Sequence, residues 1–313
     1  MIIYLLKRLI SIVPVLIGIT IFAFFIGIIS PGDPAYMSLT RDNITEPTEE
    51  EIIEKRHELG LDLPMHTQYF NWVSKVAKGD LGESIYTGED ILGELLRRLP
   101  MTVKLSLSSL LITVIFGLGL GGIMAMTRGT AIDKILRSIC TFIVSVPGFW
   151  MAIILITIFA EFLHLLPTSG YEGVKSLILP SIVLSLSTIG TSARLARAKF
   201  IGELSKQYVL VADAKGLSNK TIGCVHVFRN SLIPIVTFFG MYFAGILGGS
   251  SVIETIFSLP GLGSYAIEGI FSRDYFVIQA YVLITGTIYV LCNLFIDILY
   301  FIINPKIKQG EGL

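Results

Sequence analysis

The chain has 313 residues, of which 53% are hydrophobic and only 15% are charged, and its mean hydropathy is +0.74. This composition excludes an ordinary soluble domain and indicates an integral membrane protein. The formal net charge is zero, so the total charge points to no nucleic-acid partner, and only the placement of charge along the chain is informative.

Six apolar runs are long enough to cross a membrane as helices. A helix rises about 1.5 Å per residue and the hydrocarbon layer is roughly 30 Å thick, so a span needs about 20 residues. Because backbone groups cannot stay unpaired in lipid, each run should be helical, which predicts an all-α membrane protein with six transmembrane helices. The runs are Leu9–Ile29, Thr102–Met126, Ser138–Leu163, Leu177–Lys199, Leu232–Phe257 and Ile278–Ile303.

The first run follows Lys7 and Arg8, as the apolar part of a signal peptide would. The run is longer than the apolar region of a signal peptide usually is, and no A-x-A-like cleavage site follows it. We therefore interpret it as a retained helix.

Basic residues near the ends of the runs predict the side of the membrane on which each loop lies, because short cytoplasmic loops are enriched in Lys and Arg. The opposing short loops carry only Lys175 and Arg273. The pattern places both termini and the loop after the fourth run in the cytoplasm. The basic residues concerned are Lys7 and Arg8, then Arg128, Lys134 and Arg137, then Arg194, Arg197, Lys199, Lys206, Lys215, Lys220 and Arg229, and finally Lys306 and Lys308.

The long segment 30–101 is then predicted to be an extracytoplasmic loop, and it has 14 acidic residues against 7 basic ones. A helix is predicted over Thr48–Leu59, with its first residue as the cap and Glu51 reaching back in a capping box. A second helical piece is predicted around Tyr69–Val73, whose aromatic residues suit the membrane interface. Segments of this length usually have a task, so we favour docking of an external partner over a plain connector.

The glycines of the second run match two patterns. Gly117, Gly119 and Gly122 form G-x-G-x-x-G, but inside an apolar run with no preceding strand, which excludes a dinucleotide site. Gly117 also lies four residues before Gly121, as Gly245 does before Gly249 on the fifth run, a spacing that allows close helix packing. We favour packing, with contact to a partner chain as the alternative.

No pattern for covalent chemistry or metal binding is present in the sequence. The four histidines form no H-E-x-x-H pattern, and the three cysteines are too scattered to predict a disulfide framework. A phosphate-binding G-x-x-x-x-G-K-[ST] loop is also absent, so we expect no ATP hydrolysis by this chain. We predict no catalytic residue, no metal site and no bound cofactor, and any ATP-driven motor must be a separate subunit.

Ionisable residues inside membrane spans are costly and are therefore functional candidates. Asp297 lies one turn from Asn293 on the last run, at about the level of Arg194 and Arg197 on the fourth run. We favour an ion pair or polar contact between these helices over a proton relay, which would need several acids at different depths. Glu254, near the outer end of the fifth run, either lines a vestibule or is solvated, and the sequence leaves both open.

The turn Leu259–Gly263 contains Pro260, Gly261 and Gly263, which demand irregular backbone. At membrane depth such backbone is tolerated only where protein covers it or where it lines a wet cavity. We interpret the turn as a re-entrant or gating loop. Together with Glu254, its Pro260, Gly261 and Gly263 are candidates for the translocation path or gate.

The stretch Tyr208–Pro234 is a polar, basic loop between two apolar runs. Its core, Ala212-Asp213-Ala214-Lys215-Gly216-Leu217, has small residues that permit close approach of another protein. Gly216 can end one helical piece in a left-handed conformation, and Ser218 or Asn219 can cap the next. We predict a short helix pair able to transmit a push, and the alternative is a solvated basic loop at the inner leaflet.

Several motifs occur in order along nearly the whole chain, up to Asn304-Pro305-Lys306. They are Leu6-Lys7-Arg8-Leu9, Pro31-Gly32-Asp33-Pro34, Leu166-Pro167-Thr168-Ser169-Gly170, the Ala212 to Leu217 core with His226-Val227-Phe228-Arg229-Asn230, and the turn from Glu254 to Gly263. In these motifs the chain resembles the inner-membrane permease subunits of ATP-binding-cassette importers. The branch is the one that serves dipeptides, oligopeptides and nickel.

The resemblance implies a type I importer permease-like bundle that pairs with a second homologous permease. It also implies two cytoplasmic ATPases, which hold ATP and Mg²⁺, and an extracytoplasmic substrate-binding protein, with lipids around the bundle. Loop 200–231 would contain a coupling helix that enters a groove of the ATPase. The broader importer motif begins Glu-Ala-Ala, whereas this chain has no glutamate there, so no single contact is assigned. The residues carried over are Ala212, Asp213, Ala214, Lys215, Gly216, Leu217 and Ser218.

We therefore predict one permease domain over residues 1–313 that moves a solute inward by alternating access. Peptides are the favoured substrate, by the larger size of that group, and nickel or a metal chelate is the alternative. A secondary transporter or channel is disfavoured because the sequence shows neither paired mid-membrane acids nor an inverted repeat. A membrane enzyme is disfavoured by the lack of a nucleophile and base pattern.

Overall fold

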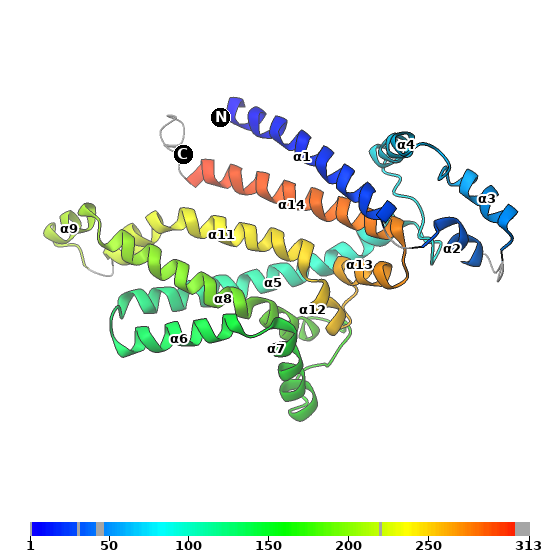
Figure 1. Cartoon of the computed structure of the whole chain (residues 1–313). Coiled ribbons are helices and arrows are strands. Elements are labelled where there is room, and N and C mark those ends of the chain that lie inside the picture. Colours follow the sequence, from blue (N-terminus) through cyan, green and yellow to red (C-terminus); the bar gives the residue numbers. More distant parts are fainter. Residues whose placement is uncertain (1, 30–31, 42–46, 219–220, 304–313) are drawn as a thin grey trace. The chain divides into compact units, whose positions relative to one another are not determined.

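Figure 1 shows a computed structural model of the chain, which describes residues 2–29, 32–41, 47–218 and 221–303. Within these ranges every regular element is a helix, and the only β-bridge joins Glu83 and Asp90. The chain divides into two compact units. We call residues 103–259 with the chain from 291 on the central unit, and residues 2–102 with 260–290 the N-terminal unit.

Four described helices are long and apolar enough to cross a membrane, and six spans result if each of two bent pairs counts as one. The six predicted runs fall on these helices and pairs. The four helices are α1 (Ile2–Ile29), α5 (Ile91–Met126), α8 (Lys175–Leu204) and α14 (Tyr275–Ile303). The first bent pair joins α6 (Ala131–Ser145) to α7 (Gly148–Leu155) with the π-helix η1 (Ile156–Phe162), and the second joins Val225–Leu232 to Pro234–Gly248.

The third predicted run, Ser138–Leu163, is not one straight helix. α6 and the helix that follows it meet at 98°, which Figure 1 shows as the turn from α6 into α7. Val146 is extended, with φ −86° and ψ 127°, and Pro147 follows it. A proline has no N–H to donate and disfavours a helical residue before it, so the helix ends there.

Other boundaries also differ from the sequence-based ones, most of all at α5 and within the fifth run. α5 begins at Ile91 instead of Thr102, because Asp90 caps it by accepting from the Gly93 N–H at 2.7 Å. The fifth run is divided into α11 (Phe228–Gly249) and α12 (Ser251–Ile256).

The central unit is held together by very close helix contacts. A Cβ atom added at Gly121 of α5 would lie 2.6 Å from the Ala196 Cβ and 2.8 Å from the Ala193 carbonyl oxygen of α8. One at Gly190 of α8 would lie 2.6 Å from the Cys140 carbonyl oxygen of α6. Because real Cβ atoms do not approach so closely, only glycine fits, and helix backbones lie nearly in contact. The predicted packing role is confirmed for Gly117 and Gly121, whose contacts lie within this chain, whereas nothing lies within 4 Å of a Cβ added at Gly119 or Gly245.

The N-terminal unit contains α2 (Pro34–Arg41), α3 (Glu49–Glu58), α4 (Met65–Ala77) and α13 (Leu262–Phe271) besides α1 and parts of α5 and α14. The predicted capping box of α3 is confirmed, because the Thr48 side chain accepts from the Glu51 N–H and the Glu51 carboxylate accepts from the Thr48 N–H. The second predicted helical piece is α4. Its Tyr69 and Trp72 rings pack on Phe24 of α1, with centroids 5.4 and 5.9 Å away.

Asp274 connects the loop before α5 to the start of α14. The Ser84 hydroxyl donates to Asp274 Oδ2 at 2.6 Å, and the Tyr86 N–H donates to the same oxygen at 3.2 Å. The other carboxylate oxygen accepts from the Val277 N–H at 3.2 Å and so caps α14. One buried carboxylate therefore satisfies donors from two elements.

Candidate functional site

The polar loop of the central unit begins with a short helix, α9 (Gln207–Ala214), which lies at the end of α8 in Figure 1. Only two residues separate α9 from Leu204, the last residue of α8. Glu203 of α8 accepts from Lys206 Nζ at 2.6 Å and from the Tyr208 hydroxyl at 3.0 Å. The start of α9 is therefore tied to the end of α8.

α9 ends in a Schellman motif. Gly216 is left-handed, with φ +77°, and its N–H donates to the Asp213 carbonyl at 2.8 Å. The Leu217 N–H donates to the Ala212 carbonyl at 3.2 Å. These two bonds around a left-handed glycine are a regular way to end a helix, so the prediction that Gly216 ends the first helical piece is confirmed.

Ser218 precedes the second helical piece, which is described from Thr221 on. Its hydroxyl accepts from the Thr221 N–H at 3.2 Å, and its carbonyl accepts from the Ile222 N–H at 3.0 Å. Ser218 is therefore a cap, as predicted, and the alternative cap Asn219 lies outside the described residues. The piece continues through the π-helix η2 (Ile222–Val227) into α11.

α9 presents different sides to its own chain and to the outside. Ala212 is buried within an apolar cluster of the central unit. Leu210 and Val211 are 69% and 53% exposed, and Ala214 and Leu217 are exposed as well. Ala212 therefore packs inward and does not face a partner, unlike the expectation from the sequence. The buried cluster consists of Ala125, Ala196, Phe200, Ala212, Ile222, Val227, Ile235 and Phe239.

A buried ion pair joins α8 to α6 in the same unit. Arg197 donates to Asp133 through two parallel bonds, from Nε at 2.8 Å and from Nη2 at 2.7 Å. The Asp133 side chain is 0% exposed and also accepts from the Gly129 N–H at 3.0 Å. Arg137, one turn along α6, approaches the same carboxylate at 3.4 Å. Asp133 is thus surrounded by two N–H groups of Arg197, the Gly129 N–H and the Arg137 side chain, near the turn between α5 and α6.

The ion pair differs from the polar contact expected between the fourth and last runs. Arg197 pairs with Asp133, and Arg194 forms no ion pair among the described residues. Asn293 and Asp297 are both half-buried on α14, four residues apart. The contact proposed for Asn293 and Asp297 stays a prediction.

Glu254 lies in α12 and is completely buried in the described chain. The Ser250 hydroxyl donates to its carboxylate at 2.6 Å. The solvated alternative for Glu254 is therefore wrong, and in this structure its side chain does not line an open vestibule either. α12 is also tied to the Leu166–Gly170 motif, because the Gly170 N–H donates to the Phe257 carbonyl at 2.8 Å. Ser258 then leaves the helix with φ +49°.

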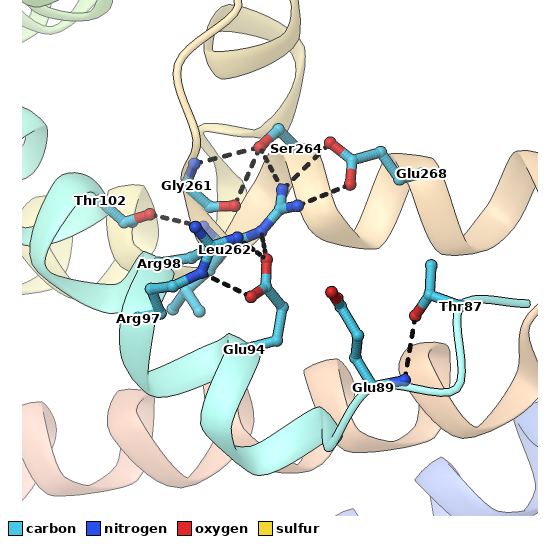
Figure 2. A network of polar contacts seen from close by, with 10 residues as sticks. All are labelled: Thr87, Glu89, Glu94, Arg97, Arg98, Thr102, Gly261, Leu262, Ser264 and Glu268. Carbon is cyan, nitrogen blue, oxygen red and sulfur yellow. Dashed lines mark hydrogen bonds and ion pairs between the residues drawn. The ribbon is translucent and has the colours of Figure 1, made fainter. Parts of the chain in front are cut away.

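The irregular turn predicted before α13 is present in the N-terminal unit. Gly261 is extended, with φ −108° and ψ 179°, and both Gly261 and Gly263 are buried, whereas Pro260 is exposed. Figure 2 shows how α13 is attached there: the Leu262 N–H donates to the Thr102 hydroxyl of α5 at 2.8 Å. The first turn of α13 is thus fixed to α5.

Arg98 of α5 is the centre of the polar network in Figure 2. Its guanidinium forms two bonds to Glu268 of α13, at 3.0 and 2.9 Å, and a third to Glu94 one turn away on α5. It also lies over the Tyr265 ring, 4.7 Å from the centroid. Arg97 donates to Glu94 twice, at 2.7 and 2.6 Å. The charges of two acids and two arginines therefore cancel within the network. The Arg98 side chain is only 13% exposed, whereas the Arg97 side chain is 70% exposed.

The sequence analysis missed these charged residues, although local signals for some of them exist. Glu94, Arg97 and Arg98 are spaced so that they meet on one side of a helix, a pattern hidden because the segment was assigned to a loop. Asp133 is a lone acid among the basic residues of its turn. Nothing local identifies Glu268 as the partner of Arg98, because they are 170 residues apart.

The long apolar helices and the breaks within them indicate a multispanning membrane protein. Two family matches make the class specific: the binding-protein-dependent transport system inner membrane component matches residues 117–309, and the N-terminal membrane component of such systems matches residues 1–106. The chain belongs to the family of inner membrane components of binding-protein-dependent transport systems.

Relatives over the full length agree with this assignment. The chain is 36% identical over 307 residues to the glutathione transport system permease protein GsiC of Escherichia coli strain K12, covering 97% of this chain and 98% of that protein. It is 35% identical over 305 residues to the GsiC protein of Salmonella choleraesuis strain SC-B67. Its fold is similar to an inward-facing structure of the MetNI methionine ABC transporter, with TM-score 0.59 and 16% identity over 69% of this chain and 99% of that chain.

The chain is therefore a permease subunit of an ATP-binding-cassette importer and a multi-pass inner-membrane protein. It is a transport subunit, and ATP is hydrolysed in separate partner subunits. The expected permease-like helical fold is confirmed by the solved neighbour.

Proposed function

We propose that the chain forms part of the translocation path of an importer for short peptides. The observation that carries this substrate class is the 36% identity, over nearly the full length of both chains, to a permease named for glutathione, which is itself a short peptide. The complete importer contains a second homologous permease, two ATPases that bind ATP and Mg²⁺, and an external substrate-binding protein. Both termini and loop 200–231 are cytoplasmic, and segment 30–101 lies outside.

The exposed side of α9 is the contact with the ATPase. Its Leu210 and Val211 offer apolar area that this chain does not cover. The Schellman motif gives α9 a defined end, and the two-residue connection to α8 makes it a short lever. Ala212 holds α9 onto its own chain, so the contact falls on the exposed members of the predicted set: Asp213, Ala214, Lys215, Gly216, Leu217 and Ser218.

The candidates for the path or gate are Glu254 in the central unit and, separately, Pro260, Gly261 and Gly263 in the N-terminal unit. A buried carboxylate is costly in a membrane protein, which supports a functional reason for keeping Glu254. The extended, buried backbone at Gly261 supports a re-entrant turn that protein covers.

The α9 contact is tested by removing its exposed apolar area. In the double variant Leu210→Ser/Val211→Ser, we expect the permease to insert normally and to lose co-purification of the ATPase, since the replaced side chains touch little of their own chain. Ile53→Ser is the matched control, because Ile53 is 66% exposed on α3 of the other unit. Normal ATPase recovery with the double variant would remove α9 from the contact.

Substrate class is tested by uptake into vesicles that contain the complete importer. We expect ATP-dependent uptake of labelled glutathione or dipeptides. ATP-dependent uptake of Ni²⁺ without peptide uptake would replace the peptide by a metal. Peptide uptake that persists without ATP would identify a secondary transporter instead.

A further inference from the structure

A displacement of α9 is passed directly to α8, because the connection between the two helices is short. The two helices are separated by Ser205 and Lys206 alone, and Glu203 of α8 accepts hydrogen bonds from Lys206 in this junction and from Tyr208 of α9. Arg197 lies seven residues before the end of α8, at about 10 Å along the axis for a rise of about 1.5 Å per residue. The ion pair between α8 and α6 therefore lies about two helical turns from the end of α8, to which α9 is connected.

The contact at Arg197 fixes orientation as well as distance. Two parallel bonds from one guanidinium to one carboxylate hold both groups in a common plane. Asp133 lies in the first turn of α6 and also holds the turn before it through the Gly129 N–H. Its negative charge suits the positive end of the α6 dipole. The pair therefore attaches the start of α6, and the turn leading to it, to α8.

A second fixed point lies further along the same two helices. At Gly190 the backbone of α8 comes so close to the Cys140 carbonyl of α6 that no side chain fits between them. The two helices lie side by side in Figure 1, and α6 ends at the sharp bend before α7. A movement of α8 at Arg197 is thus carried by α6 as a whole towards that bend, because two attachments on one pair of helices prevent sliding.

We propose that Asp133 and Arg197 are positioning residues for energy coupling: their ion pair passes a movement of α9 from α8 to α6. The pair contacts neither the solute nor the ATPase. The inference rests on the proposed function, in which α9 is the ATPase contact, and adds the route by which its movement enters the span formed by α6 and α7.

The test measures solute uptake and ATP hydrolysis together in the reconstituted complete importer. For Asp133→Asn we expect the ATPase to remain bound and active while uptake per ATP hydrolysed falls about tenfold, a loss within the usual range of coupling between sites. Arg137→Gln is the matched control, because Arg137 is a more exposed arginine that approaches the same acid at 3.4 Å from the same helix. It should keep the wild-type ratio.

Arg197→Lys provides a second variant in case Asp133→Asn fails to fold. Lysine keeps the charge but cannot form the two parallel bonds, so we expect a folded protein, judged by its unchanged melting temperature, with a smaller loss of uptake per ATP. A wild-type ratio in Arg197→Lys and in any folded Asp133→Asn protein would overturn the inference. Failure of the proposed function looks different, since the ATPase would then bind normally to the Leu210→Ser/Val211→Ser permease.

Discussion

Two attachments of α5 in this permease, one in each unit, hold helices together by different physical means. In the central unit, α5 and α8 meet where Gly121 leaves no space for a side chain against Ala196. In the N-terminal unit, α13 is attached to α5 by Arg98, Glu268 and the Thr102 hydroxyl. The first attachment depends on shape and the second on charge and hydrogen bonds.

The difference determines which substitutions each of these two contacts tolerates. A contact between helix backbones contains no buried charge, so substitutions that change charge should not weaken it. A substitution that adds volume at the contact should weaken it, because there is no space for the added atoms. A buried ionic network repays the cost of desolvation only while every partner is present, so loss of one acid leaves an unbalanced arginine. The comparison predicts that the contact between α5 and α8 is sensitive to added volume and that the contact between α5 and α13 is sensitive to loss of charge.

The largest effect is expected for Glu94→Gln. The substitution keeps the shape of the side chain but leaves Arg98, which is mostly buried, with one acid fewer. Breaking a buried ion pair costs about 3–5 kcal/mol, and we expect the lower end because Arg97 is exposed to water. The free energy of unfolding of the purified permease in detergent measures the loss.

Glu89→Gln is the control for that substitution. Glu89 is an exposed acid of the same segment, and its carboxylate makes no hydrogen bond to the residues drawn in Figure 2. A surface change of this kind should alter stability by less than about 0.5 kcal/mol. Equal effects of the two substitutions would show that the network does not hold the N-terminal unit.

A smaller effect is expected for Gly121→Ala in the central unit. The added methyl group would overlap the Ala193 carbonyl oxygen and the Ala196 side chain, so α5 and α8 must separate. Overpacking of this kind costs roughly 2 kcal/mol. Gly119→Ala adds the same methyl group two residues earlier, where nothing lies within 4 Å, and should leave the melting temperature unchanged. A matching loss in both variants would attribute the effect to helix backbone changes and not to packing.

Local features of the fold could be predicted from the sequence. The length of an apolar run predicts a span, and the capping box at Thr48 and the left-handed Gly216 follow from residues within one or two turns. The break at Pro147 had a local signal too. The break was missed because the run Ser138–Leu163 was identified by its average hydrophobicity, which one proline hardly changes.

Contacts between distant residues could not be predicted in this way. Asp133 and Arg197 are 64 residues apart, and several basic residues near Arg197 were equally good partners in the sequence. Ala212 and Ala214 are alanines on either side of Asp213, yet the fold buries Ala212 and leaves Ala214 exposed. Side-chain direction depends on which helices pack together, and this information is not local.

The smallest effect tests whether charge matters only where it is buried. His57 and Asp62, near the end of α3, form an exposed pair with Nδ1 and Oδ2 2.7 Å apart. The hydrogen bond to Asp62 raises the pKa of His57, and the same bond lowers the pKa of Asp62. The His57 contribution is therefore complete below the ordinary histidine pKa of 6.5 and is lost as the pH rises through the raised value.

The Asp62 contribution has the opposite sign. It is complete above the ordinary pKa of 3.8 and is lost as the pH falls through the lowered value, so the pair is strongest between these two pKa values. We expect the pKa of His57, followed by NMR, to fall towards its ordinary value in Asp62→Asn and at high salt, because exposed charges are screened. The melting temperature should stay nearly constant throughout. A loss of stability as large as that of Glu94→Gln would show that exposed charge holds the N-terminal unit as strongly as buried charge does.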